Sequence, residues 1–441
     1  MHELIHPGQL KGHHAAVVGA GRSGIAAARL LAALGACTRL MERDESRITS
    51  KDRDLALELG WDMRIGEHTA EDFAGVDLVV LSPGVPLSSL ASLLPEGVKV
   101  ISELELASWF VSEPMIAVTG TTGKTTTTAL IGHVLERCGK TVFVGGNIGV
   151  PLSEYLLAEK PADILVLEVS SFQLQHTDSF HPMVGVFVNF SPNHLDVHTS
   201  EEEYFMAKLA LFANMRERDL AVLHLSLKDE LEARTFTRAK RIYYVGTDRF
   251  DCPSLSGPHN QENLEAAWLA CRYFGITQED MARTLADFRP KPHRLERIGE
   301  HQGVCFVDDS KATTLTALEA ALKSFEQPVI LLAGGIFKGG DPSSLTPLFR
   351  ERVKAVCLFG ASREVFEPAW RAACPTTWNP TLEEAVQTAC QQAQSGDVVL
   401  LSPATSSFDL FENYKARGKA FCKAVEAYYG ELVTHCDQIG D

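Results

Sequence analysis

The nine residues Val118–Thr126, VTGTTGKTT, constrain the fold most strongly, because a loop of this kind needs a strand before it and a helix after it. The apolar run MIAV precedes the loop, and the helical run TTTALIGHVLERCG follows it. This arrangement aims backbone N–H groups and a helix N-terminus at phosphate. Lys124 can reach the phosphates of a nucleotide, and the Thr125 hydroxyl can bind a magnesium ion, Mg²⁺. The stretch therefore predicts an ATP site built from Gly120, Thr121, Thr122, Gly123, Lys124, Thr125 and Thr126.

One position departs from the common phosphate-loop pattern. The pattern G-x-x-x-x-G-K-[ST] has a glycine five residues before its second glycine, where this chain has Val118. The alternative interpretation is a tight strand-to-helix turn with an exposed lysine. The strand context and the Lys124-Thr125 pair together favour the phosphate loop.

Length and composition exclude several classes of protein. A chain of 441 residues is long enough for two or three domains, and 45% hydrophobic with 22% charged residues is typical of a soluble globular protein. No apolar run reaches the length of a membrane span, and the N-terminus does not resemble a signal peptide. The net charge of −16, without a basic block, argues against nucleic acid. Ten scattered cysteines without metal spacing indicate reduced thiols in a cytoplasmic protein.

Short β-rich runs alternate with helical stretches along the whole chain, which predicts an α/β fold with largely parallel sheets. The prolines in FRPKPHR mark one boundary, because proline disfavours helix at and before itself. We expect three domains: an N-terminal Rossmann-like domain (1–113), a central phosphate-loop ATP-binding domain with a mainly parallel sheet (114–290) and a C-terminal Rossmann-like domain (291–441).

Three residues after the loop are candidates for the metal site. Glu168 ends the apolar strand ILVLE, at the sheet edge where a parallel sheet binds ligands. His194, in SPNHLDVH, follows another strand and is either a ligand or a loop residue. Lys208, in EEEYFMAKLALF, is either a solvated helix lysine or a metal ligand after carbamylation by CO₂, since an ammonium group cannot bind Mg²⁺.

The stretches GTTGKTT, LEVSSFQL and NHLD, with Lys208 following, resemble the Mur ligase family. Further matches through the chain are GPHNQENLEAA, PHRLE, VDDSKATT, GGIFKG and SPATSSFDLFENYKARG. The resemblance implies a cytoplasmic, ATP-dependent amino-acid ligase of peptidoglycan precursor synthesis, and it accounts for Val118. It also implies that Thr125 and Glu168 serve one Mg²⁺ while His194 and carbamylated Lys208 serve another, with Lys124, His194 and Lys208 as catalytic residues.

The last block indicates the substrates within that family. DDSKATT, GGIFKG and SSFDLFENY are similar to the member that joins D-glutamate to UDP-N-acetylmuramoyl-L-alanine, and the D-N-P-R stretch of the diaminopimelate-adding member is absent. Another Mur-type amino-acid ligase is the alternative, and we expect a monomer. The resemblance implies nucleotide contacts from both the central and the last domain, at Asn260, Asn263, Arg294 and Asp309. It implies D-glutamate contacts at Thr313, Lys338, Ser407, Phe408 and Tyr414.

The N-terminal stretch GAGRSG follows a strand, and Glu42 ends the next strand, which satisfies a dinucleotide fingerprint. Taken alone, this pattern predicts an NAD-binding dehydrogenase. The family resemblance instead implies that the turn holds the diphosphate of the UDP-sugar, through Gly21, Arg22, Ser23, Ser82, Pro83, Gly84 and Asn147. Arg43 and Asp44 depart from the Thr-Arg pair expected beside uracil. A third alternative, a scaffold with a decayed site, conflicts with the presence of Lys124 and Glu168.

Overall fold

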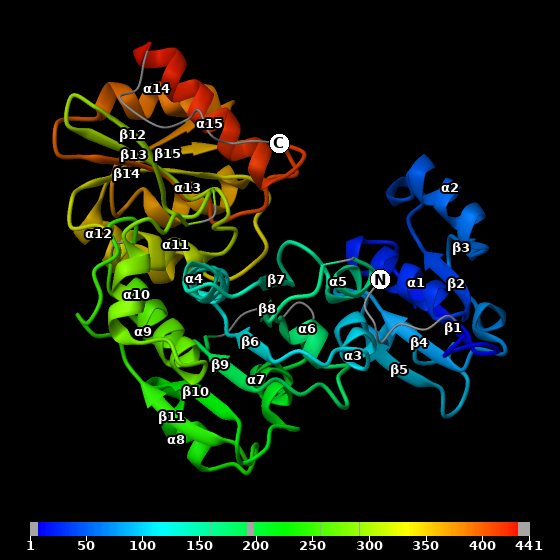
Figure 1. Ribbon diagram of the computed structural model, residues 1–441. Coiled ribbons are helices and arrows are strands. Elements are labelled where there is room, and N and C mark those ends of the chain that lie inside the picture. The colour runs from blue at the N-terminus through cyan, green and yellow to red at the C-terminus, as the bar shows by residue number, and fades with distance from the viewer. Residues whose placement is uncertain (1–7, 159, 192–197, 256, 291, 431–441) are drawn as a thin grey trace. The chain divides into compact units, whose positions relative to one another are not determined.

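The computed structural model describes residues 8–158, 160–191, 198–255, 257–290 and 292–430, which form three open α/β sheets with helices between the strands (Figure 1). The expected α/β fold is confirmed. Contacts divide the chain into two compact units: residues up to Asp251 with Glu262–Asp287, and Cys252–Gln261 with the residues from Phe288 onward. The first unit holds two of the sheets and the second unit holds the third. The domain boundaries at 113/114 and 290/291 stay predictions.

The first sheet has the strand order β3-β2-β1-β4-β5, with all neighbouring strands parallel. The order reverses between β1 and β4, so the loops after these strands open a crevice at the carboxyl edge. Gly24 in α1 lets this helix approach the β1 loop, because a Cβ there would lie 1.9 Å from the Gly19 carbonyl oxygen. The elements are β1 His14–Val18, α1 Arg22–Ala33, β2 Cys37–Glu42, α2 Ser50–Leu59, β3 Asp62–Ile65, β4 Leu78–Leu81, β5 Lys99–Ser102 and α3 Glu103–Ser108.

The second sheet, in the order β11-β10-β9-β6-β8-β7, is also parallel throughout. Its order reverses at β6, between β9 and β8, and the phosphate loop leaves the sheet there. The strands are β6 Met115–Thr119, β7 Val142–Gly146, β8 Ile164–Glu168, β9 Val184–Phe187, β10 Leu220–His224 and β11 Lys240–Tyr244. The helices are α4 Lys124–Arg137, α5 Leu152–Leu157, α6 Ser171–Leu174, α7 Glu201–Leu209, α8 Lys228–Glu232, α9 Pro258–Tyr273 and α10 Gln278–Leu285.

The third sheet has the order β12-β13-β17-β14-β15-β16, and it is mixed because β12 runs antiparallel to β13. The loops after β13, β17 and β14 leave adjacent strands at one edge. The strands are β12 Glu296–His301, β13 Val304–Asp308, β14 Val329–Gly334, β15 Val353–Phe359, β16 Thr376–Asn379 and β17 Val398–Leu401. The helices are α11 Leu315–Leu322, α12 Thr346–Arg352, α13 Arg363–Trp370, α14 Leu382–Gln392 and α15 Tyr414–Tyr429.

The central strands are buried on both faces, as covered parallel sheets require. All five residues of β6, all five of β8 and all four of β17 are buried. The nine cysteines within the described residues form no disulfide. In the same part of the chain, no helix combines the length and apolarity that crossing a bilayer demands.

Candidate active site

The phosphate loop leaves β6 and enters α4, which begins at Lys124 with Gly123 as its N-cap. Within the described part of the chain no side chain caps α4 there, so its first N–H groups point toward the place where a phosphate would bind. The Lys124 ammonium donates to the carbonyl oxygens of Gly120 and Thr121, each at 2.9 Å. The strand–loop–helix arrangement expected from VTGTTGKTT is therefore present.

Glu168 ends β8 directly beside β6, where it pairs in register with Val118. Its side chain is buried, and its Oε2 accepts a hydrogen bond from the Thr125 hydroxyl at 2.5 Å. Its Oε1 accepts from the Asn147 amide at 2.7 Å. The structure thus brings together two of the predicted ligands. A carboxylate and a hydroxyl oxygen are ligands that Mg²⁺ accepts, so this pair fits the ion.

Lys208 lies on α7 and is 1% exposed, with its Nζ donating to the Gly120 carbonyl oxygen at 2.8 Å. The same Nζ stands 4.3 Å from the centre of the Tyr204 ring. Burial, followed by the positive charge of Lys124, lowers the pKa of Lys208 well below its usual value, while Glu168 opposes the shift. Lys208 is therefore not a solvated helix lysine. A neutral amine is also the form that reacts with CO₂.

Two further candidates of this unit are His194, predicted to bind metal, and Asn263, predicted to contact the nucleotide. His194 lies outside the described residues. Asn263, on α9, is buried, and its Oδ1 accepts from the Thr127 hydroxyl at 3.1 Å. Since Thr127 is in the first turn of α4, Asn263 lies beside the helix that follows the phosphate loop.

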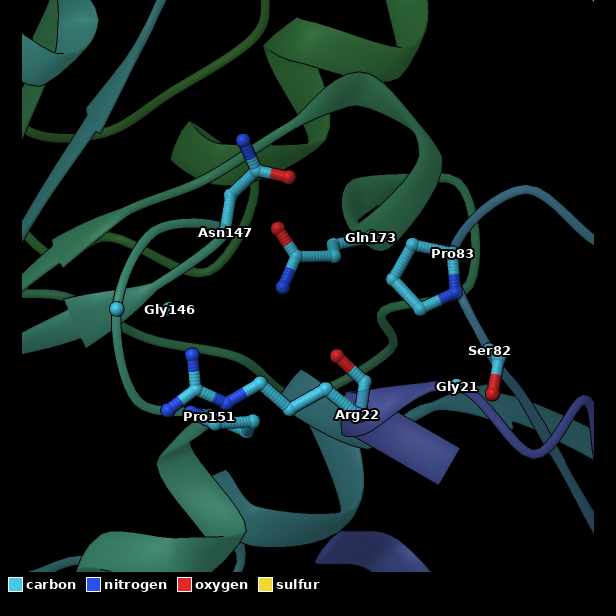
Figure 2. A pocket seen from close by; sticks show the side chains of 10 residues that line it. Gly21, Arg22, Ser82, Pro83, Gly146, Asn147, Pro151 and Gln173 are labelled. Atoms are coloured by element: carbon cyan, nitrogen blue, oxygen red, sulfur yellow. The ribbon is translucent and has the colours of Figure 1, made fainter. Parts of the chain in front are cut away.

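A cavity of about 280 Å³ opens where the strand order of the first sheet reverses. It is lined on one side by Gly21, Arg22, Ser23, Ser82 and Pro83, and on the other by Gly146, Asn147, Gly149, Pro151 and Gln173. Figure 2 shows the side chains of Arg22 and Gln173 beside this space, with the carboxamide of Asn147 directed away from Arg22. Six of the residues predicted to hold the UDP-sugar thus share one cavity, and the seventh, Gly84, follows Pro83 in the chain.

This cavity is connected to the phosphate loop through a short run of hydrogen bonds. Asn147 lines the cavity and donates to Glu168, which in turn accepts from Thr125. Thr125 is the second residue of α4, next to Lys124. A ligand that fills the cavity therefore lies on a route of direct contacts to the residues predicted to handle ATP.

Glu42, the acidic residue of the dinucleotide fingerprint, is held by backbone hydrogen bonds. Its two carboxylate oxygens accept hydrogen bonds from the backbone N–H of Ala20, at 2.8 Å, and of Asp44, at 3.0 Å. The side chain is 6% exposed and braces the GAGRSG turn. In a dinucleotide fold this carboxylate binds the ribose hydroxyls. Arg43 forms an exposed ion pair with Glu67, and Asp44 accepts from the Ser46 backbone.

In the other compact unit, Asp309 follows β13 and is buried. It accepts hydrogen bonds from the Ser402 hydroxyl and from the Leu295 backbone N–H. Burial raises the pKa of Asp309 to about 7. Arg294 stands between His293 and Leu295, both of which have left-handed backbone conformations, with φ of 66° and 46°. Asp309 and the turn that carries Arg294 are thus in direct contact; Asn260 is buried in the same unit.

The residues predicted for D-glutamate lie on loops at the carboxyl edge of the third sheet. Thr313 follows β13, Lys338 follows β14, and Ser407 and Phe408 follow β17. The β14 and β17 loops pair through backbone hydrogen bonds between Ile336 and Ser406, which brings their loops together. Lys338 and Phe408 are exposed, whereas Ser407 is buried. Tyr414 begins α15, and Lys311 lies 4.1 Å from the centre of its ring.

The structure adds two residues that the sequence analysis did not single out. Gln173 is buried, its Oε1 accepts from Ser170, and its Nε2 has no hydrogen-bond partner among the described residues. Figure 2 shows this side chain beside the cavity that Gln173 lines. Asn189 contacts the phosphate loop. Gln173 stands in LEVSSFQL, a stretch already matched to the family, and that was the available signal.

The fold and the loop define a class of protein. It comprises the ATP-dependent α/β enzymes that carry a phosphate loop in the second of three sheets. Three family descriptions match: the Mur ligase MurD-like N-terminal domain over residues 13–102, the Mur ligase middle domain over 118–252, and the Mur ligase glutamate ligase domain over 293–405. The chain belongs to the Mur ligase family, and it is an ATP-dependent ligase that forms amide bonds.

Similar proteins cover nearly the whole chain. A UDP-N-acetylmuramoylalanine--D-glutamate ligase of Oleidesulfovibrio alaskensis is 52% identical and aligns over 95% of this chain and 94% of its own. The ligase of the same name from Desulfovibrio desulfuricans is 50% identical over 94% and 96%. Among solved structures, the MurF ligase of Thermotoga maritima in complex with ADP has a TM-score of 0.61 at 18% identity, covering 89% of this chain and 95% of that chain. This last likeness concerns the fold.

Proposed function

We propose that this ligase joins D-glutamate to UDP-N-acetylmuramoyl-L-alanine with ATP, releasing ADP and phosphate, in the cytoplasmic synthesis of peptidoglycan precursors. Relatives that carry this activity in their names are up to 52% identical to the chain over nearly its full length. The observation that carries the proposal is the run of contacts from the cavity to the phosphate loop. We also propose that the protein is a monomer.

The proposed chemistry activates a carboxylate that is itself a poor electrophile. The terminal carboxylate oxygen of the UDP-substrate takes the γ-phosphoryl group of ATP, and ADP leaves. The amine nitrogen of D-glutamate then attacks the acyl carbon of this acyl phosphate and loses a proton. The tetrahedral intermediate collapses, phosphate leaves with the C–O bond electrons, and the peptide bond closes. Charge on the transferring phosphoryl oxygens has to be stabilised by cations throughout the first step.

The residues of this chain supply that stabilisation and the binding sites. Lys124 would place its ammonium on the transferring phosphoryl group, beside the N–H groups at the start of α4. Bound Mg²⁺ supplies further positive charge, and the ligands would be Thr125 and Glu168 for one ion and His194 with carbamylated Lys208 for a second. The cavity beside Arg22 and Asn147 would hold the UDP-sugar.

The last sheet would bind the amino acid. Lys338 would pair with one carboxylate of D-glutamate, while Thr313, Ser407 and the backbone at Phe408 take the remaining polar groups and Tyr414 forms an aromatic wall. Arg294 offers a planar fork of donors for phosphate, and Asp309 offers acceptors for ribose hydroxyls.

Phosphate release tests the proposal directly. The full chain is incubated with ATP, Mg²⁺ and UDP-N-acetylmuramoyl-L-alanine, and a panel of D- and L-amino acids is added one at a time. We expect release with D-glutamate and background levels with L-glutamate. Release that depends on a different amino acid would assign another Mur-type activity. Tight binding of NADH without binding of UDP would contradict the ligase and favour the dehydrogenase alternative.

A further inference from the structure

Asn189 holds the phosphate loop from the neighbouring strand. It lies two residues after β9, which pairs with β6 on the side away from β8. Its carboxamide oxygen accepts from the backbone N–H of Thr122 at 2.9 Å, and its carboxamide nitrogen donates to the Thr122 carbonyl oxygen at 3.1 Å. The carboxamide therefore pairs with both polar groups of one loop residue, as a neighbouring backbone strand would do.

Thr121 is tied to the same segment by further hydrogen bonds. Its N–H donates to the backbone carbonyl of Asn189 at 3.1 Å and to the carboxamide oxygen at 3.2 Å. Its hydroxyl donates to the Ser191 carbonyl at 3.1 Å and accepts from the Ser191 N–H at 3.1 Å. Two successive loop residues are thus fixed to the chain that leaves β9.

The close approach depends on Gly120. A Cβ on Gly120 would lie 2.4 Å from the Val188 side chain and 3.2 Å from the Asn189 carbonyl oxygen, and its φ of +148° is one that residues with side chains rarely adopt. The loop therefore packs directly against the residues that follow β9. Thr121 and Thr122 are fixed in this way directly before Gly123, the N-cap of α4. The N-terminus of this helix is the place where a phosphate would bind.

We propose that Asn189 is the positioning residue of the phosphate loop, and that its carboxamide fixes the shape of the loop before nucleotide binds. The proposal rests on the proposed role of this loop in ATP binding. A loop that is already shaped loses less conformational freedom when the nucleotide binds, so its affinity for nucleotide is higher. The competing account is that the carboxamide oxygen occupies the place of a phosphate oxygen and leaves when nucleotide arrives.

Nucleotide affinity separates the two accounts. Asn189→Ala removes every side-chain hydrogen bond to the loop, and Asn189→Ser leaves a hydroxyl that cannot reach both groups of Thr122. Asn189 is partly exposed, so neither change opens a buried cavity. We expect ADP, titrated calorimetrically into the full chain with Mg²⁺, to bind about tenfold more weakly to both variants. The KM for ATP should rise in parallel, while the KM values for the UDP-substrate and D-glutamate stay within about twofold.

Asn214→Ala is the matched control. Asn214 also braces a loop of this unit with its carboxamide, which donates to the carbonyls of Asp178 and Phe180, and both of these partners lie outside the phosphate loop. This variant should bind ADP as the parent does, and thermal unfolding of all three variants checks that they are folded. If only one Asn189 variant folds, the ADP affinity of that variant decides between the two accounts.

Two results would overturn the proposal. Parent-like affinity in the Asn189 variants means that the loop needs no brace, and tighter binding means that the carboxamide competes with phosphate. Failure of the proposed function looks different, because the parent protein itself would then neither bind ADP nor release phosphate. Parent-like binding by the variants with an active parent contradicts the role of Asn189 alone.

Discussion

At the residue scale, two lysines share one carbonyl oxygen. The side chains of Lys124 and Lys208 both donate to the Gly120 carbonyl, at 2.9 and 2.8 Å. Two ammonium groups this close repel one another, and Lys208 is the buried one. The pKa of Lys208 is lowered by burial and then by the charge of Lys124. Burial beside Lys124 therefore favours the uncharged form of the Lys208 amine.

Lys124→Ala should abolish phosphate release, because it removes a cation from the transferring phosphoryl group, an effect typically of about two or more powers of ten. Lys140→Ala is the control, since Lys140 is an exposed lysine just beyond the other end of the same helix. Turnover of the Lys124 variant within about tenfold of the parent would refute the role of the loop.

The carbamate on Lys208 can be tested by chemical rescue. Lys208→Ala should be inactive and partly restored by acetate, because a small carboxylate can occupy the oxygen site that the carbamate leaves. If the amine itself were required, a small amine would restore activity and acetate would not. Phosphate release is the readout, and rescue by the amine alone would rule out the carbamate.

At the scale of a single element, α3 carries two carboxyl groups with opposite shifts. Burial raises the pKa of Glu103 to about 7, although the Ser153 N–H, which donates to one oxygen, acts in the opposite direction. The other oxygen has no hydrogen-bond partner among the described residues. Burial also acts to raise the pKa of Glu105, but hydrogen bonds from Ser179 and Trp109 lower it below its usual value. The N–H groups of Asp178, Ser179 and Phe180 bind the same carboxylate.

These shifts predict opposite effects of two matched substitutions. A raised pKa means that the stability from protonated Glu103 is present below its ordinary pKa of 4.5 and is lost as the pH rises through about 7. Glu103→Gln should therefore gain stability relative to the parent between pH 5 and pH 8, on the order of 3 kcal/mol. Glu105→Gln should lose about 2–4 kcal/mol at pH 8, because its amide turns a donor toward the backbone N–H groups.

Urea unfolding at pH 5 and pH 8 measures both effects. Glu96→Gln, which alters an exposed carboxyl in the same domain, is the control and should follow the parent at both pH values. If the free energy of unfolding changes between pH 5 and pH 8 by the same amount in the Glu103 variant and in the parent, the buried carboxyl does not titrate in this range.

At the scale of the whole molecule, the predicted nucleotide contacts fall on both compact units. Lys124 and Asn263 belong to one, while Asn260, Arg294 and Asp309 belong to the other. Arg294→Ala should therefore weaken ADP binding about tenfold or more in the full chain, although it lies far from the phosphate loop in sequence. Arg297→Ala is the matched control, because Arg297 is an exposed arginine paired with Glu300 on β12. Parent-like ADP affinity in the Arg294 variant would confine the nucleotide to the first unit.

Local patterns in the sequence determined the class of protein. The phosphate loop could be predicted because a strand, two glycines, the Lys124-Thr125 pair and a helix are consecutive in the chain. Alternating apolar runs were enough for an α/β fold with parallel sheets, since buried parallel strands leave a continuous apolar signature. The antiparallel β12 was not foreseen, because strand direction depends on which edge the chain reaches.

Only the tertiary structure decided which residues meet. GAGRSG suits a dinucleotide and a UDP-sugar equally well in sequence, and only the tertiary structure shows that Glu42 accepts from the backbone of this region and that Asn147 and Gln173 line the same cavity as the turn. The burial of Lys208 and the brace at Asn189 require strand β9 and helix α7 to reach a loop that is distant in sequence. No local pattern encodes such contacts, since they form when non-consecutive strands become neighbours in a sheet.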